Sequence, residues 1–414
     1  MRSMTLSIFA AFLAVSTVSL FMTPTRAAAQ KEALIYSFLD NNRDGSSPPA
    51  APIFDAAGNL YGMTSFGGAH NYGAVFELSP KVGGGWREQI LHSFSNTGKD
   101  GYNPYAGLVL DAAGNLYGTT AYGGAHNGGI VFELSPLPSG VWNEKILHNF
   151  TPGTTDGYDP QAGLVIDTAG NLFGTTVLGG IYGGGTAFEL TASGGAWSEK
   201  LLHPFSAKGA GGDNPRSTLI LDSAGNLYGT AEGGGSSHSG TAFELTPASK
   251  GPWTETVLHT FGTAATDGVN PQAGLIFDAA GNLYGTTTSG GASTYGTVFE
   301  LTPAAGGTWI ETVLYSFLAN GIDGYYPTAG LILDAVGNLY GTTDNGGAFY
   351  GTVFQLSPSA SGSWTETQLY VFNLNGGDGT YPFGGLVFDA TGNLYGATST
   401  GGPYNEGVVF EITP

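Results

Sequence analysis

A Gly-Asn pair inside the motif Asp-x-x-Gly-Asn-Leu-Tyr-Gly recurs along this chain at a nearly constant interval. The spacing between successive copies is 55 or 56 residues. So regular a period means that one structural unit is copied along the chain, and any fold must account for it. The glycine of the pair stands at seven positions: Gly58, Gly114, Gly170, Gly225, Gly281, Gly337 and Gly392.

Each unit contains four segments that have the properties of short β-strands. In the second unit they are residues 106–110, 115–120, 129–134 and 144–150. All four are rich in β-branched and aromatic residues and are bounded by Gly, Pro, Ser or Asn, as strands are. The Asp-x-x-Gly-Asn motif predicts a tight hairpin between the first two, because Asp can accept backbone N–H bonds and Gly can adopt a left-handed conformation. A Ser-Pro and Gly-rich loop before a Trp predicts a second hairpin between the third and fourth strands.

The two ends of the chain predict how the units assemble. Residues 32–38 are a lone copy of the fourth strand, whereas residues 407–412 are a third strand that no fourth strand follows. Seven complete sheets exist only if the N-terminal strand joins the C-terminal sheet, which is how a propeller ring is closed. The sequence therefore predicts an all-β, seven-bladed β-propeller, with residues 30–414 as one domain. An open solenoid is the alternative, although its terminal repeats should be atypical.

Aromatic residues occupy two strand positions in every unit, as Tyr117 or Phe173 and Phe132 illustrate. Sevenfold occupancy is what packing between blades demands, so we predict that these rings form the core. Gly118 and its equivalents lie in the middle of a strand, where glycine weakens a sheet unless another group comes close. We expect a ring from the neighbouring blade to fill that space.

One position of the fourth strand alternates between histidine and tyrosine. The alternation excludes a metal-ligand role common to all units and favours a half-buried hydrogen-bonding group. The residues at this position are His92, His148, His203, His259, Tyr36, Tyr315 and Tyr370.

The N-terminus has the properties of a secretory signal peptide. Arg2 precedes an apolar run over residues 6–22, and small residues follow before Gln30. We expect cleavage after Ala29, so that residues 1–29 are the signal peptide and the mature chain is extracellular or periplasmic. The alternative is an uncleaved membrane anchor. No later apolar run reaches a transmembrane length, and the absence of cysteine excludes disulfides, thiolate sites and a lipoprotein anchor.

The formal net charge of −20 says little about partners, because most of the acidic residues occupy repeated scaffold positions. The 12 basic residues form no cluster, which argues against nucleic acid and anionic membranes as partners. We expect a monomer whose partner is an extracellular glycan or another surface component.

The loops at the far end of each blade from the Asp-x-x-Gly-Asn hairpin are the predicted place for binding. Tyrosines outside the scaffold positions all fall in these loops, and exposed rings beside polar groups suit sugars. The alternative is that the rings pad the loops against one another. The predicted ligand-binding residues are Tyr102, Tyr122, Tyr158, Tyr295, Tyr325, Tyr326, Tyr350 and Tyr381.

Two further sets of loop residues are candidates for chemistry. The aspartates of a repeated Asp-Gly pair could hold Ca²⁺, the only cofactor considered, although such residues commonly cap their own turn. These calcium candidates are Asp100, Asp156, Asp267, Asp323 and Asp378. The fourth unit departs most from the repeat and places an acid, a base and a cation in its loops, although ordinary loop drift explains them too. These catalytic candidates are Asp213, Arg216, Glu232 and His238.

Residues 281–291 and 296–303, Gly-Asn-Leu-Tyr-Gly-Thr-Thr followed by Gly-Thr-Val-Phe-Glu-Leu-Thr-Pro, resemble the bacterial secreted tandem-repeat family called GloVer-containing. The resemblance covers the whole mature chain. It implies an exported β-rich protein, often with a C-terminal surface anchor, but it brings no known catalytic residues and no established activity. This sequence departs from the anchored pattern because it reaches Pro414 without an apolar tail or a basic end.

Three functions remain open from the sequence. The first is a secreted, non-catalytic propeller that binds extracellular or cell-surface carbohydrate through its Tyr-, Gly- and Asp-rich loop face. The second is an extracellular polysaccharide lyase or hydrolase with its site on the fourth repeat. The third is a structural protein of the cell envelope.

Overall fold

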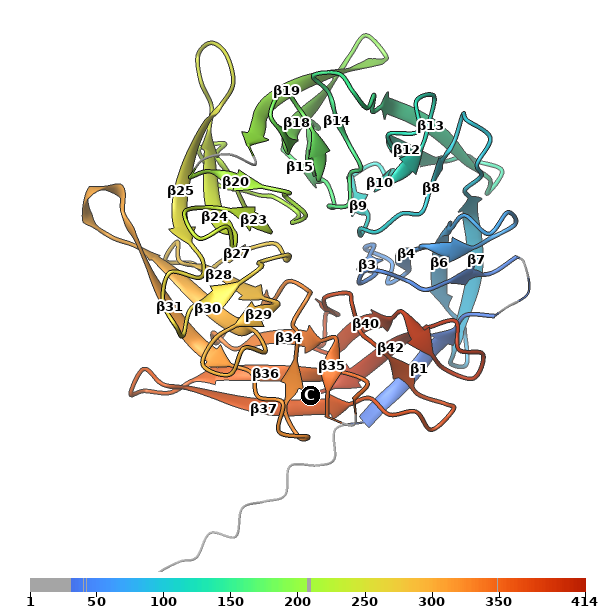
Figure 1. Cartoon of the computed structure of the whole chain (residues 1–414). Helices are drawn as coiled ribbons and strands as arrows, with labels where there is room; N and C mark the ends of the chain where they lie inside the picture. Colours follow the sequence, from blue (N-terminus) through green and yellow to red (C-terminus); the bar gives the residue numbers. More distant parts are fainter. Residues whose placement is uncertain (1–30, 40, 42, 207–209, 348) are drawn as a thin grey trace, which may run out of the picture.

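Seven four-stranded antiparallel sheets surround a central axis as the blades of a closed propeller (Figure 1). The computed structural model describes residues 31–414 except 40, 42, 207–209 and 348, so the predicted signal peptide lies outside the described residues. Within these residues the structure has no α-helix, and a short 3₁₀ turn, η1, spans Ala305–Gly307. It follows that no described helix is long and apolar enough to span a membrane. The predicted seven-bladed, all-β fold is confirmed.

Each blade runs from a two-residue strand at the channel to a long strand at the outside. The innermost strands are β3 (Ile53–Phe54), β9 (Val109–Leu110), β15 (Val165–Ile166), β21 (Ile220–Leu221), β27 (Ile276–Phe277), β33 (Ile332–Leu333) and β39 (Val387–Phe388). The second strands are β4 (Leu60–Thr64), β10 (Leu116–Thr120), β16 (Leu172–Thr176), β22 (Leu227–Ala231), β28 (Leu283–Thr287), β34 (Leu339–Thr343) and β40 (Leu394–Thr398).

The outer half of each blade is a longer hairpin. The third strands are β6 (Ala74–Pro80), β12 (Ile130–Pro136), β18 (Gly183–Ser193), β24 (Thr241–Thr246), β30 (Thr297–Pro303), β36 (Thr352–Pro358) and β42 (Val408–Thr413). The outermost strands are β7 (Trp86–Ser93), β13 (Trp142–Asn149), β19 (Ala196–Ser206), β25 (Thr254–Thr260), β31 (Trp309–Ser316), β37 (Trp364–Val371) and β1 (Lys31–Ser37). Blade 1 begins with β3 and blade 7 with β39.

The ring closes as predicted, because the N-terminal strand completes the last blade. Strand β1 pairs antiparallel with β42, from Lys31 opposite Thr413 to Ser37 opposite Val408. Blade 7 therefore has the order β1-β42-β40-β39 and contains both ends of the described chain (Figure 1).

The strand boundaries differ from the prediction at two places. The outer hairpin continues through Pro136 and Trp142, which are paired with each other, so the Ser-Pro segment and the Trp belong to the ladder rather than to the loop. The innermost strand contains only Val109 and Leu110, because the preceding residues line the channel without pairing to a further strand.

The repeated rings form the predicted contacts between blades. In one cluster Tyr61 and Phe94 of blade 1 pack against Leu116 and Phe132 of blade 2, and all four are buried. The prediction for Gly118 is wrong in one respect: the ring that lies against it is Phe132 of the same blade. Gly118 and Phe132 are directly opposed across β10 and β12, and a Cβ on Gly118 would lie 2.7 Å from the tip of that ring. A cross-strand ring therefore covers the glycine and requires it.

The Asp-x-x-Gly-Asn motif forms the predicted hairpin between the first two strands. Asp111 Oδ1 accepts hydrogen bonds from the N–H groups of Ala113 and Asn115, both at 2.8 Å, and its Oδ2 accepts one from Tyr117. Gly114 has a φ of 87°, which favours glycine. The seven hairpins lie at one end of the blades, which we call the hairpin face, and the loops between second and third strands lie at the other.

Candidate ligand-binding site

The crossover that enters each blade, which has the sequence Asp-Gly-x-x-Pro in all blades but the fourth, pairs with the loop between the second and third strands of that blade. In six blades the pairing makes a separate two-stranded sheet, and in blade 3 the pair also joins β18 through Gly179 and Gly184; the sequence did not predict these residues as strands. These pairs are β2 (Gly45–Ser46) with β5 (Phe66–Gly67), β8 (Gly101–Tyr102) with β11 (Tyr122–Gly123), β14 (Gly157–Tyr158) with β17 (Leu178–Gly179), β20 (Gly212–Asp213) with β23 (Gly233–Gly234), β26 (Gly268–Val269) with β29 (Ser289–Gly290), β32 (Gly324–Tyr325) with β35 (Asn345–Gly346), and β38 (Gly379–Thr380) with β41 (Thr400–Gly401). The crossovers and the loops between second and third strands therefore lie together on one face.

A left-handed residue fixes the end of each crossover. In blade 2 it is Asn103, whose N–H donates to the carbonyl of Tyr72 in the preceding blade and whose own carbonyl accepts from Ala121 N. Two backbone bonds to two blades hold a conformation that costs a non-glycine residue free energy. The seven residues, all with φ between 52° and 60°, are Ser47, Asn103, Asp159, Asn214, Asn270, Tyr326 and Tyr381.

Two positions after each left-handed residue, one side chain enters the mouth of the central channel. We call these seven residues the channel ring: Pro49, Tyr105, Gln161, Arg216, Gln272, Thr328 and Phe383. All seven line one cavity of about 420 Å³, within the range of small-molecule sites. Beneath the ring the channel is lined mostly by Ala and Gly of the same crossovers. The ring is therefore the first place at which the rigid frame presents large side chains that differ from blade to blade.

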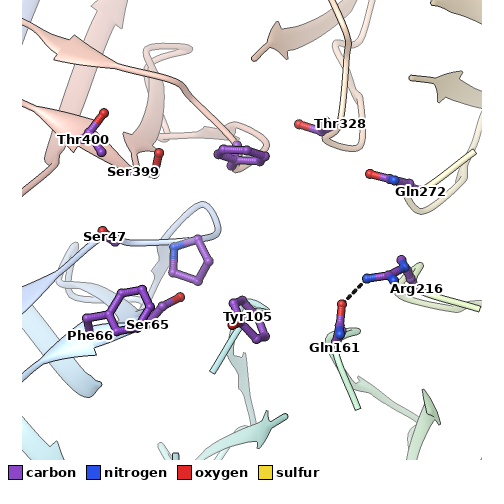
Figure 2. Close-up of a pocket in the computed structure, with 12 residues that line it drawn as sticks. Ser47, Ser65, Phe66, Tyr105, Gln161, Arg216, Gln272, Thr328, Ser399 and Thr400 are labelled. Carbon is purple, nitrogen blue, oxygen red and sulfur yellow. Dashed lines mark hydrogen bonds between the residues drawn. The ribbon is translucent and has the colours of Figure 1, made fainter. Parts of the chain in front are cut away.

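One side of the cavity combines aromatic rings with the hydroxyl groups of Ser47, Ser65, Ser399 and Thr400, and the other side is polar. Tyr105, Phe383 and the nearby Phe66 are 38%, 45% and 45% exposed, so their rings are open to a ligand. Figure 2 shows Gln161, Arg216 and Gln272 across the opening from Phe66. An aromatic wall facing convergent amide and guanidinium groups is the usual composition of a site for a small polar molecule.

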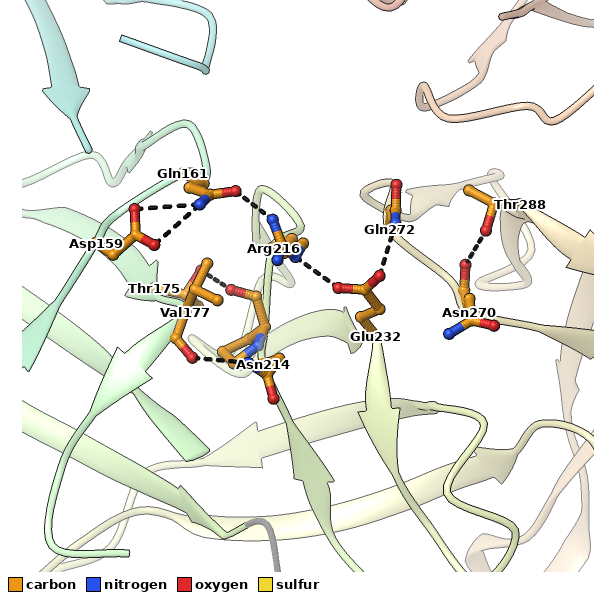
Figure 3. Close-up of polar contacts among 11 residues, drawn as sticks. Asp159, Gln161, Thr175, Val177, Asn214, Arg216, Glu232, Asn270, Gln272 and Thr288 are labelled. Atoms are coloured by element: carbon orange, nitrogen blue, oxygen red, sulfur yellow. Dashed lines mark hydrogen bonds and ion pairs between the residues drawn. The ribbon is translucent and has the colours of Figure 1, made fainter. Parts of the chain in front are cut away.

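The polar side is held by a hydrogen-bonded network that crosses three blades (Figure 3). Both carboxylate oxygens of Asp159 accept bonds from Gln161 Nε2, at 3.1 and 3.0 Å, and Gln161 Oε1 accepts a bond from Arg216 Nη1. Arg216 Nε donates to Glu232 Oε2 at 2.6 Å, and Glu232 Oε1 accepts from Gln272 Nε2 at 2.7 Å. A charged pair with amide groups at both ends fixes the orientation of each side chain.

The four catalytic candidates of the fourth unit lie in one region but not in one cavity. Arg216 and Glu232 form the ion pair just described, and of the four only Arg216 lines the cavity. Burial raises the pKa of Asp213, the charge of His238 works to lower it, and the charge of Glu232 raises it further. His238 itself is exposed and has a left-handed backbone with a φ of 54°. The arrangement can orient polar groups of a ligand.

The eight predicted tyrosines surround the cavity rather than line it. Tyr295 contacts the rings of Tyr325 and Tyr326, with centroids 5.4 and 6.0 Å apart. Tyr102 lies 5.7 Å from Tyr122, and Tyr350 lies 6.1 Å from Tyr381. The contacts of Tyr295 and Tyr350 join loops of adjacent blades, which is what the padding alternative predicts. Tyr122 and Tyr326 nevertheless keep 38% and 37% of their surface exposed.

The calcium candidates lie in the seams between blades, and each carboxylate already accepts hydrogen bonds. Asp323 Oδ2 accepts bonds from the backbone N–H of Leu318 and from the hydroxyl of Tyr315, at 2.8 and 2.9 Å. Asp156, Asp267 and Asp378 make equivalent hydrogen bonds with His148, His259 and Tyr370. Asp100 accepts a bond from Ser95 N, and its Oδ2 lies 3.3 Å from His92 Nε2 without a hydrogen bond between them. A Glu from the outermost strand of the next blade completes each set.

We call these sets of three residues the seam clusters. They are Tyr36 with Asp44 and Glu88, His92 with Asp100 and Glu144, His148 with Asp156 and Glu199, His259 with Asp267 and Glu311, Tyr315 with Asp323 and Glu366, and Tyr370 with Asp378 and Glu32. The half-buried hydrogen-bonding role expected for the His and Tyr position agrees with this arrangement.

The seam between blades 3 and 4 compensates for a missing aspartate. Gly211 stands where the others have Asp, and Glu255 reaches into the space, accepting a bond from Gly212 N at 2.8 Å. Its other oxygen lies 3.4 Å from His203 Nε2. A Cβ on Gly211 would lie 2.5 Å from that oxygen, so the glycine is part of the compensation.

The sequence reasoning missed most of the channel ring. It proposed Arg216 but not Pro49, Gln161, Gln272, Thr328 or Phe383, and it left Tyr105 out of its ligand set. A signal was present in the sequence: the residue after the crossover proline changes in size and polarity between units, whereas the two residues that follow it are small in every unit.

The closed ring, the sevenfold repeat and the cavity at the channel mouth together define a tandem-repeat β-propeller with a potential ligand site on its axis. The model of the Gloeobacter/Verrucomicrobia repeat matches residues 21–145, 137–349 and 253–414. The chain therefore belongs to the Gloeobacter/Verrucomicrobia repeat family, which confirms the resemblance noted in the sequence.

Solved structures of other propellers are similar in fold. A candidate 6-phosphogluconolactonase from Bacteroides uniformis ATCC 8492 has a TM-score of 0.51 and 14% identity, covering 81% of this chain and 86% of its own. A chain of the mitotic checkpoint complex has a TM-score of 0.54 and 13% identity, covering 100% of this chain and 99% of its own. At these identities the similarity shows the fold alone. A search of curated protein sequences found no significant match.

Proposed function

We propose that this protein is an exported, non-catalytic propeller that binds neutral carbohydrate at the channel ring. The observation that carries the proposal is that exposed aromatic rings on one side of the cavity face the polar side that Gln161, Arg216 and Gln272 form. A sugar has the matching surface, because its C–H faces are apolar and its hydroxyls both donate and accept. Tyr105 and Phe383 would stack on the former while Gln161 and Gln272 bind the latter.

The charges on the polar side of the cavity favour a neutral ligand. The Arg216 guanidinium is paired with Glu232, and Asp159 is linked to the same network through Gln161. The three charges sum to a negative total, so the cavity offers no uncompensated positive charge to a phosphate or carboxylate. Neutral hydroxyl groups can still bind the free lone pairs and N–H groups of these side chains.

The outer tyrosines would extend the site for a longer glycan. Tyr122 and Tyr326 are the more exposed members of their clusters and can take further sugar units by stacking. Export is part of the proposal, since it places the cavity where extracellular or surface glycans occur. The signal-peptide features of residues 1–29 support it.

Binding of the mature protein to an array of neutral oligosaccharides tests the proposal. We expect Tyr105→Ala and Gln272→Ala each to weaken binding about tenfold, which corresponds to about 1.4 kcal/mol. Tyr182→Ala is the matched control, because Tyr182 lies in a loop between second and third strands, is 59% exposed and does not line the cavity. Loss of binding in Tyr325→Ala and Tyr326→Ala with no effect of Tyr105→Ala would move the site to the outer tyrosines. No binding to any neutral glycan would overturn the proposal.

An extracellular lyase or hydrolase is the second candidate, favoured by acidic groups near the same rim. Burial raises the pKa of Asp344 to about 6, which is suitable for a proton donor. Asp344 follows the second strand of its blade at the position that Glu232 has in blade 4. Turnover of a polysaccharide that Asp344→Asn or Glu232→Gln abolishes, in protein that remains folded, would favour the enzyme over the binding protein.

A further inference from the structure

Two of the seam clusters bring the donor atoms of three metal-binding groups within 4.8 Å of one another. His92 Nε2 lies 3.3 Å from Asp100 Oδ2 and 3.5 Å from Glu144 Oε1. In the other, His259 Nε2 lies 3.3 Å from Asp267 Oδ1, with a Glu311 oxygen within 4.8 Å of both. A tetrahedral Zn²⁺ with bonds of about 2.0–2.2 Å places its ligand atoms roughly 3.3–3.5 Å apart. The three N···O separations of 3.3–3.5 Å therefore match the ligand spacing of a zinc site.

Buried carboxylate oxygens at these two seams lack hydrogen-bond partners, as those of Glu88, Glu366 and Asp378 do at other seams, so the separation of the donor atoms is what distinguishes the two clusters. Asp100 is 8% exposed, and its Oδ1 and the Oε1 of Glu144 have no hydrogen-bond partner among the described residues. The Oε1 of Glu311 is likewise buried without a hydrogen-bond partner among the described residues. Buried unpaired carboxylate oxygens cost free energy unless a cation or a proton meets them. Each cluster has two carboxyl groups and one imidazole, so a cation balances its charge better than the imidazole alone.

We propose that the clusters His92–Asp100–Glu144 and His259–Asp267–Glu311 each bind a divalent transition-metal ion, of which Zn²⁺ is the best match. The imidazole nitrogen and carboxylate oxygens of these clusters are donor types that zinc accepts, whereas Ca²⁺ takes six to eight oxygens. Each site would join the outermost strands of two adjacent blades, β7 to β13 and β25 to β31. The metal would tie the ring together at two seams, independently of the ligand at the channel ring.

The other seams supply controls that the chain already contains. Three clusters have Tyr in place of His, at Tyr36, Tyr315 and Tyr370, so a His→Tyr change keeps a side chain that these seams accommodate. The His203 seam lacks the aspartate and has only two ligand groups. Of the described residues, only the two proposed clusters bring three such donor atoms within 4.8 Å.

Metal stoichiometry of the purified, tag-free mature protein tests the proposal. After chelator treatment and exchange into Zn²⁺, elemental analysis and calorimetry should find two ions per chain and a raised Tm. His92→Tyr and His259→Tyr should each remove one ion, the double variant both, and His203→Tyr none. Refolded Tm values without metal check that the variants are intact.

Two results would overturn the metal sites. One is zinc binding no greater in the wild type than in the His92→Tyr/His259→Tyr double variant. The other is tight Ca²⁺ binding that the double variant retains, since it would assign the carboxylates to an oxygen-only site. Either result would leave the seam clusters as proton-sharing contacts between blades.

Discussion

The hairpin face and the channel ring are built by the same seven repeats, yet they differ in how much the repeats agree. On the hairpin face Asp111 and its equivalents make nearly identical hydrogen bonds in every unit, as the matching bonds of Asp55 show. In the channel ring the corresponding residues range from Pro49 to Arg216. Sevenfold agreement is what a closed ring needs for packing, whereas one ligand on the axis needs unlike groups around it. The comparison teaches that the most repeated motif marks the scaffold and the least repeated position marks the site.

The largest effect on the free energy of unfolding should come from a substitution in the repeated core. Phe132 is fully buried between blades and covers Gly118. Phe132→Ala should lower the free energy of unfolding by about 3–5 kcal/mol, because it leaves a cavity in a close-packed seam. Tyr105→Ala in the channel ring should change it by no more than about 0.5 kcal/mol. If denaturant titrations gave equal losses of stability for Phe132→Ala and Tyr105→Ala, the distinction between scaffold and site would be wrong.

A substitution in the Asp-x-x-Gly-Asn hairpin should have the next largest effect on stability. Asp111→Ala removes hydrogen bonds to Ala113, Asn115 and Tyr117 and should cost about 1–2 kcal/mol. Burial works to raise the pKa of Asp111, but the bonds from Asn115 and its neighbours outweigh it and lower the pKa. The contribution is therefore present at neutral pH and lost as the pH falls through the folded-state pKa. A cost measured by denaturation that stays constant down to pH 2 would contradict this assignment.

The seam clusters should give the opposite pH dependence. Burial and the charge of a neighbouring Asp raise the pKa of Glu88 and of Glu366 from 4.5 to about 7. Because the folded state holds these protons more tightly, the stabilisation is complete below pH 4.5 and is lost as the pH rises through about 7. The Tm should thus fall between about pH 5 and pH 8, and Glu88→Gln and Glu366→Gln should reduce the fall. Glu133→Gln, outside the seam clusters, is the control, and a Tm that rises over this range would refute the prediction.

The smallest effect on stability should coincide with a clear effect on binding. Phe383 is 45% exposed, so Phe383→Ala should leave the Tm within a few degrees of the wild type. Glycan affinity should nevertheless fall about tenfold, because the aromatic wall loses a ring. A variant that is destabilised but binds normally would place Phe383 in the scaffold.

Much of the fold could be predicted from the sequence because every blade repeats the same sequence pattern. The spacing of the Gly-Asn pairs, the β-branched and aromatic strand residues and the unmatched terminal strands were enough to predict the blades and the closure of the ring through β1 and β42. The small sheets such as β8 with β11 escaped prediction, since two-residue pairings between Gly-rich loops depend on the tertiary frame. The occupant of the space beside Gly118 depended on ring direction, which the pattern does not give.

The site was less predictable for a physical reason. Tyr105, Gln161 and Arg216 are brought together only because seven crossovers end at the same height in the channel, and no local pattern links them. The tyrosines were predicted because they lie in loops outside the scaffold positions, and the aspartates because they recur in the Asp-Gly pair. The aspartates instead make contacts at the seams between blades, as Asp323 with Tyr315 illustrates. Arg216 was found from the sequence because it departs from the repeat.

Glycan binding by a variant with a uniform channel ring tests the central claim most directly. The variant combines Pro49→Ala, Tyr105→Ala, Gln161→Ala, Arg216→Ala, Gln272→Ala, Thr328→Ala and Phe383→Ala, and it leaves the hairpin face and the seam clusters unchanged. If the channel ring is the site, the variant will fold with a Tm a few degrees from that of the wild type and will bind none of the neutral oligosaccharides that the wild type binds. Retained binding in this folded variant would contradict the assignment of the ligand site to the channel ring.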